Sequence, residues 1–301
     1  MRRAGGTPSA RARPAARLHP DREAGRLRWT APLLADRTSL TPLLPTLALA
    51  LAASAGGTAH DPAAPPPAAA AGAPHGATRA PPPGPATPAA PDLLALVARS
   101  AEAYGGRALL ESHPVVIQEG TVTSAMRGGA EGRMTRIFER PVRLRVSISY
   151  GGDTEQRVLD GMAGWREGRP VQGPPHLAMV LQAARLDLPL LLVAQAGSLL
   201  DGGTVEREGQ RLRVAVLPLG DGMSLAAEID PATARVLRAI ARLDWAGPTL
   251  EFVTTFSDFR RVAGQLVPFR EENVAQGRQT GTTVLSRVEY LREAPTGAFR
   301  P

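Results

Sequence analysis

The chain has 301 residues, carries 35 basic residues against 28 acidic ones, and contains no cysteine. The lack of cysteine excludes disulfides, thiol nucleophiles and cysteine-bound zinc. Most of the net charge of +7 lies before residue 92, because residues 92–301 carry 25 Arg against 24 acidic residues. No basic stripe with interleaved aromatic residues is visible there, so we expect no nucleic-acid partner.

The N-terminal part is typical of an export signal followed by a tether. Residues 39–57 contain a short apolar run that ends in Ala-Ser-Ala at 53–55, the pattern of a signal-peptide cleavage site. Residues 62–91 are almost entirely Ala, Pro, Gly and Thr, a composition that buries too little apolar surface to fold. We expect a signal peptide over 1–55, with an uncleaved N-terminal anchor as the alternative, and a disordered linker over 56–91.

A helix and then a long series of strands follow the linker. Helical spacing over 92–112 starts at Asp92, the expected N-cap, and Gly105-Gly106 breaks it. Residues 141–150 alternate apolar and polar side chains, which indicates a half-buried antiparallel strand. The same pattern recurs at 115–124, 132–140, 154–161, 210–218, 223–230, 234–244, 249–260, 266–274 and 282–291. Glycine-rich turns separate these segments, so we expect a meander of about ten or eleven strands.

One segment interrupts the alternation. Residues 174–200 show no period of two, begin with two prolines and carry apolar residues at helical spacing. Pro189 is expected to divide the segment into two short helices, the second of them apolar on every side. A wide antiparallel sheet must curl, and its concave face needs a cover. We therefore expect these helices to form a lid.

Two short motifs carry a resemblance to a known family. They are "IFERPVRLRV" over 137–146 and "LDGMAGWREGRP" over 159–170. With the order of elements, they make the chain resemble the LolA/LolB-like carriers of outer-membrane lipoproteins and the related lipoprotein-sorting proteins. The resemblance implies a mainly antiparallel β fold with α, an unclosed and strongly curved barrel under a helical lid. It would span 92–295, followed by a flexible tail over 296–301.

The resemblance also implies a role for Arg140. In the carriers, the arginine of the "RP" dipeptide donates hydrogen bonds to lid carbonyls and holds the empty pocket shut. The alternative is an ordinary strand-end arginine in a surface ion pair. The ligand would lie between one face of the central strands and the lid. The expected lining residues are Phe138, Leu144, Val146, Ile148, Leu177, Leu181, Leu190, Leu191, Val214, Val216, Phe252 and Phe256.

Trp165 follows the turn at Asp160-Gly161, on a hairpin that leads into the lid. Packing between hairpin and lid is one interpretation, and a place at the mouth of the pocket is the other. Both interpretations predict that Trp165 lies where the sheet meets the lid.

Catalytic groups are scarce in the part expected to fold. It offers two histidines, His113 and His176, and no motif typical of hydrolases, zinc peptidases or phosphate-binding loops. Glu271 and Glu272 are adjacent and therefore point to opposite faces of their strand. We expect no enzymatic activity, no cofactor and no metal.

The sequence thus predicts a periplasmic carrier that holds the acyl chains of a lipid or an acylated lipoprotein, with at most transient membrane contact. Two alternatives stay open. One is an envelope sensor of the same fold that binds a protein partner. The other is a structural domain whose hollow is filled by its own side chains.

Overall fold

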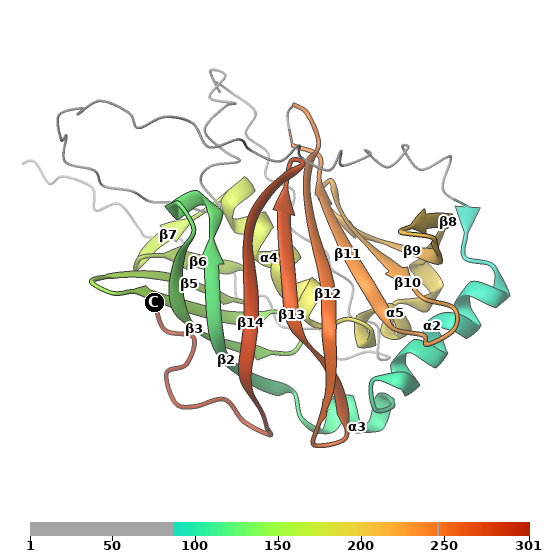
Figure 1. Ribbon diagram of the computed structural model, residues 1–301, viewed down its shortest axis with the longest axis horizontal. Coiled ribbons are helices and arrows are strands. Elements are labelled where there is room, and N and C mark those ends of the chain that lie inside the picture. Colours follow the sequence, from blue (N-terminus) through green and yellow to red (C-terminus); the bar gives the residue numbers. More distant parts are fainter. Residues whose placement is uncertain (1–86, 246) are drawn as a thin grey trace, which may run out of the picture.

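The computed structural model describes residues 87–245 and 247–301. The expected signal peptide and most of the expected linker lie outside the described residues. The rest forms a single 14-stranded antiparallel sheet that curves strongly and does not close, with helices across one face and beside one edge (Figure 1). This is the open barrel with a helical lid that the sequence predicts.

The strands follow the predicted segments closely. They are β1 (Thr87–Pro88), β2 (Val115–Ser124), β3 (Ala130–Glu139), β4 (Arg143–Tyr150), β5 (Asp153–Asp160), β6 (Ala163–Arg166), β7 (Arg169–Val171), β8 (Leu200–Arg207), β9 (Gln210–Gly220), β10 (Met223–Ile229), β11 (Val236–Leu243), β12 (Leu250–Val262), β13 (Gln265–Ala275) and β14 (Arg278–Leu291). All ten predicted strands are present. The additional four are β1, the short pair β6 and β7, and β8.

The order of strands explains why the lid crosses the hollow. The sheet runs β1-β8-β9-β10-β11-β12-β13-β14-β2-β3-β4-β5-β6-β7, so it consists of two meanders joined where the last strand pairs with β2. The segment after β7 leaves one edge of the sheet, and β8 begins near the other edge. The chain between them must therefore span the sheet.

That connecting segment forms two helices, α4 (Pro174–Leu186) and α5 (Leu190–Ala194), which separate at Pro189 as predicted. Helix α4 contacts strands of both meanders, namely β4, β5, β6, β10 and β11. Its buried side chains join the main core with those of the sheet. Residues 174–194 are called the lid from here on.

The N-terminal helical segment consists of α2 (Pro91–Ala103) and α3 (Arg107–Ser112). Gly105 and Gly106 separate the two helices and have φ of 126° and 83°, a region that favours glycine. The predicted N-cap is wrong: Ala90 caps α2 without a side-chain bond, and Asp92 lies in the first turn. Asp92 pairs instead with Arg213 at 3.2 Å.

The C-terminal residues lie against the sheet rather than extending away from it. Phe299 is 4% exposed, and the guanidinium of Arg143 lies 4.3 Å from the centre of its ring. Arg145 donates hydrogen bonds to the carbonyl oxygens of Ala298 and Arg300. The segment expected as a tail is thus part of the packed structure.

None of the helices in the described part of the chain is long and apolar enough to span a lipid bilayer.

Candidate functional site

A cavity of about 180 Å³ lies between α4 and the concave face of the sheet. It occupies one part of the hollow, on the side of β2 to β5 and β12 to β14. Elsewhere the hollow is filled by the main core, in which lid residues such as Leu192 and Ala183 are fully buried against sheet residues. The predicted hollow is therefore present, but side chains fill much of it.

Part of the cavity wall is apolar and was predicted. Four of the predicted lining residues contribute to it, namely Val146, Ile148, Leu181 and Phe252. Other apolar lining residues are Val122, Met134, Ala178, Ala241, Val253, Val274 and Ala275.

The other part of the wall is polar and charged. Its lining residues are Ser124, Arg136, Glu155, Arg157, Gln182, Arg185, Thr254, Glu271, Asn273, Thr280 and Thr283. Three guanidinium groups thus share the cavity with two carboxylates. This end of the cavity was not predicted from the sequence.

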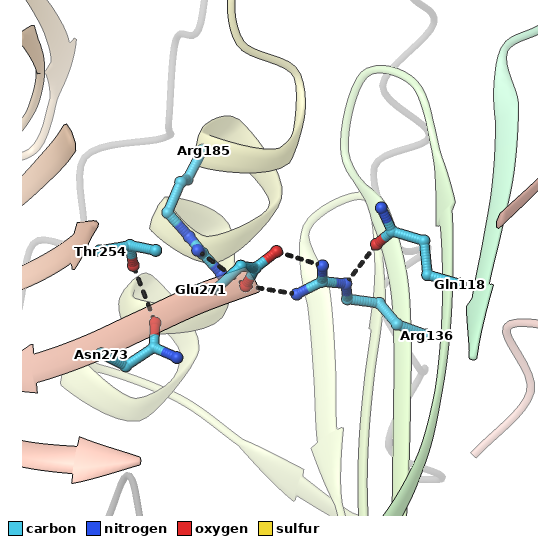
Figure 2. Close-up of polar contacts among 6 residues, drawn as sticks. All are labelled: Gln118, Arg136, Arg185, Thr254, Glu271 and Asn273. Carbon is cyan, nitrogen blue, oxygen red and sulfur yellow. Dashed lines mark hydrogen bonds and ion pairs between the residues drawn. The ribbon is translucent and has the colours of Figure 1, made fainter. Parts of the chain in front are cut away.

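Glu271 is the centre of a buried ion-pair network (Figure 2). Arg136 of β3 donates two hydrogen bonds to its carboxylate, at 2.5 and 3.1 Å, and Arg185 of the lid donates a third at 3.2 Å. Arg136 also donates to the side-chain oxygen of Gln118. Burial alone would raise the pKa of Glu271, but the two guanidinium groups outweigh it and hold the pKa at about 2. Glu271 is therefore ionised, and it fastens the lid to the sheet.

Arg157 of β5 is much less well paired. Its nearest carboxylate oxygen belongs to Glu155, 3.5 Å from its Nε atom, and the same oxygen lies 3.7 Å from Arg166. Among the described residues, the buried Nε of Arg157 finds no hydrogen-bond partner. Burial lowers the pKa of Arg157, Glu155 opposes that effect, and the positive charges of Arg166 and Arg136 add to it.

The arginine predicted to hold the lid does contact it, by a different bond from the one expected. Arg140 donates from Nε to Asp187 at 2.6 Å and from Nη1 to the carbonyl oxygen of His113. Asp187 ends helix α4, so the contact is made to a lid carboxylate and not to lid carbonyls. Burial raises the pKa of Asp187 to about 6, although Arg140 lowers it.

The other predicted lining residues lie away from the cavity. Phe138, Leu144, Leu177, Leu191 and Phe256 belong to the main core or pack against it, and Leu190 belongs to a separate cluster with Tyr104, Leu110 and Leu266.

The prediction for Val214 and Val216 is wrong. They do not line the cavity; they pair with Glu228 and Ala226 of β10 and cluster with Ile240 and Val205. Ala215 and Leu217 belong to the main core on the opposite face of the same strand.

The position predicted for Trp165 is also wrong. Its neighbour Gly164 faces the lid, where an added Cβ would lie 2.8 Å from the ring of His176. Alternation along β6 then directs Trp165 to the other face, beside its cross-strand partner Val158. The tryptophan near the start of the lid is Trp245, whose ring lies 3.9 Å from a Cβ built on Gly173.

The sequence pattern around the buried charges Arg136 and Glu271 could have predicted their burial. Arg136 lies between Met134 and Phe138 on the face that alternation assigns to the interior. Glu271 likewise continues the buried series of Val267 and Phe269 along β13. A charge in register with buried apolar residues predicts a buried charge, and a buried charge requires a partner. As expected, Glu272 points the other way and pairs with Arg270.

No cluster of three or more acidic or histidine side chains that could hold a metal ion occurs among the described residues.

No known family model matches the sequence, and no curated protein matches it. Several solved structures are similar, among them the following three. One is a domain provisionally named as an outer membrane lipoprotein-sorting protein from Vibrio parahaemolyticus, with 13% identity and a TM-score of 0.42, over 68% of this chain and 95% of that one. The second is a LolA superfamily protein from Nitrosomonas europaea, with 13% identity and a TM-score of 0.44, over 67% of this chain and 95% of that one.

The third is a DUF1329 family protein from Desulfovibrio piger, with 12% identity and a TM-score of 0.38, over 68% of this chain and 95% of that one. Likeness at this level identifies no ligand for this chain.

Proposed function

We propose that the protein is a non-enzymatic carrier of the cell envelope that binds the apolar part of a lipid or an acylated lipoprotein between α4 and the sheet. The cavity under the lid is the observation that carries this proposal. Its apolar wall comes from both meanders and from α4, so a ligand there would contact all three parts of the fold. Export by the segment over 1–55 and a periplasmic location belong to the same proposal.

The size of the cavity sets a condition on the mechanism. An engineered apolar cavity of about 150 Å³ holds one benzene molecule, so a cavity of similar size holds only a short group. A long acyl chain would gain about 0.8 kcal/mol for each buried CH₂, but it fits only if the lid moves outward. The closed lid is held at Glu271 and at Arg140. Exchange of these ion pairs for water would accompany ligand entry.

Two other functions remain as outcomes of the test. A domain with a filled hollow is supported by the dense packing of the lid against β10 and β11. A sensor would bind a protein partner in place of lipid. Native mass spectrometry after mild extraction separates the three, because co-purified lipid, a stoichiometric protein and a bare chain differ in mass.

A cavity-filling variant tests the site itself. Ala178 lines the cavity and is 5% exposed, so Ala178→Leu should occupy part of the space and weaken binding of decanol at least ten-fold, as measured by calorimetry. Ala194→Leu makes the same change on an exposed lid position and serves as the control. Equal affinities of the two variants and the unchanged protein would place the ligand elsewhere.

A further inference from the structure

The charges around the cavity do not balance. Arg136 and Arg185 share the carboxylate of Glu271, and these three groups satisfy one another through close hydrogen bonds. Arg157 has only Glu155, at a distance too long for a hydrogen bond, and Arg166 approaches the same carboxylate oxygen. Among the described guanidinium groups that line the cavity, Arg157 is therefore the one without a carboxylate at hydrogen-bond distance.

Arg157 is placed where a ligand could reach it. Its side chain is 16% exposed, and it lines both the main cavity and a smaller adjoining pocket of about 20 Å³. The two spaces also share Ala178 and Gln182 of α4. Arg157 thus lies beneath the lid, at the wall between the two spaces.

Within the described part of the chain, the buried Nε of the Arg157 guanidinium lacks a hydrogen-bond acceptor. Burying a charge is unfavourable unless hydrogen bonds and an opposite charge replace its water. Arginine stays protonated in proteins and offers five donors that match the oxygens of a carboxylate or a phosphate. An anionic ligand would supply the acceptors that Arg157 lacks.

We propose that Arg157 binds the anionic group of an amphipathic ligand, a carboxylate or a phosphate, while Val146, Ile148 and Phe252 contact its apolar chain. This inference rests on the proposed function and adds to it the chemical class of the ligand. Arg136 and Arg185 do not serve this purpose, because Glu271 already occupies them. The neutral apolar wall and the cationic end lie in one cavity, as a single-headed amphiphile requires.

Calorimetric titration of the full chain with decanoate, decyl phosphate and decanol tests the inference. We expect at least one anion to bind ten-fold or more tightly than decanol, through charge-assisted hydrogen bonds. Whichever anion binds more tightly identifies the group as a carboxylate or a phosphate. Arg157→Gln should abolish the preference while decanol still binds. Arg133 is an exposed arginine on β3, and the control variant Arg133→Gln should keep the preference for the anion.

A second variant keeps the inference testable if Arg157→Gln does not fold. Glu155→Gln removes the carboxylate that competes for Arg157, so decanoate affinity should rise several-fold. Equal affinity for all three compounds in the unchanged protein would overturn the anion site and leave the carrier proposal standing. Binding of none of them would overturn both.

Discussion

Single residues on the concave face decide how the lid is fastened. Arg136 and Glu271 occupy positions in register with large apolar side chains, yet their charges satisfy each other across the sheet. Such a pair does little for stability compared with an apolar pair, but removal of one member leaves a buried charge without a partner. Removal of the Glu271 carboxylate would leave two buried arginines, Arg136 and Arg185, without it.

Glu271→Gln is therefore expected to lower the free energy of unfolding by about 3 kcal/mol or more, within the range for breaking a buried pair. Urea unfolding followed by circular dichroism measures the change. The adjacent Glu272→Gln breaks an exposed pair with Arg270 and should change stability by less than about 1 kcal/mol. Similar losses in the two variants would mean that the Glu271 network contributes no more than a surface pair.

At this scale, alternation predicts the face of a residue but not its partner. Val146 and Ile148 lie in the cavity wall, on the face that alternation assigns to the interior. Alternation fails at Val214 and Val216, because β9 is apolar on both faces and the smaller Ala215 is the one that faces the core. The sizes of the side chains along β9 therefore do not predict which face of the strand points to the core.

The lid carries a buried titratable group, Asp187, beside its ion-pair partner Arg140. Asp187 at the end of α4 has its pKa raised to about 6 by burial, from an ordinary value of 3.8. The folded, closed state therefore binds the proton more tightly than an open or unfolded state. Linkage then requires that the stabilisation from this group is full below pH 3.8 and is lost as the pH rises through about 6.

The difference in unfolding free energy between the unchanged protein and Asp187→Asn should accordingly fall as the pH rises from 4 to 6 and stay constant above that. Each unit of pKa difference corresponds to about 1.4 kcal/mol. Urea unfolding of both proteins at several pH values measures this. A difference that does not vary with pH would show that Asp187 titrates normally.

Most elements were predictable, because period-two alternation and glycine turns mark them clearly. Strand β8 was missed because it contains Gly202-Gly203 and a register shift between Asp201 and Thr204, which disrupts alternation. Strands β6 and β7 have four and three residues, too few for a period to show. Pro189 divided the lid as expected, since proline removes a helical hydrogen bond.

The whole molecule is held together by contacts between distant parts of the chain. Strand β14 pairs with β2, and the terminal segment then returns to β4. There Phe299 lies against Arg143, and Arg145 donates hydrogen bonds to the terminal backbone. The last residues thereby join both meanders. A sequence read locally predicts a meander but gives no sign of this pairing, because nothing in β2 or β14 specifies a partner more than 100 residues away.

Phe299→Ala is expected to lower the free energy of unfolding by about 3 kcal/mol, the lower end for a buried phenylalanine, because a terminal segment can shift to fill the space. Thermal and urea unfolding measure the loss. Arg300→Ala, an exposed change beside it, is the control. A loss as small as that of the control would mean that the terminal segment contributes little to the core.

The unclosed sheet leaves two edges, which in many proteins invite the addition of strands from other molecules. One edge ends in β7, only three residues long and containing Pro170, which has no amide hydrogen to donate. At the other edge, the two-residue strand β1 pairs only with Leu200 and Asp201 of β8. The rest of β8 has an irregular register and carries the charged residues Glu206 and Arg207. Within the described residues, neither edge of the sheet offers a long regular template for strand pairing. The described sheet can therefore stay unclosed without offering other copies of the chain a regular edge for strand pairing.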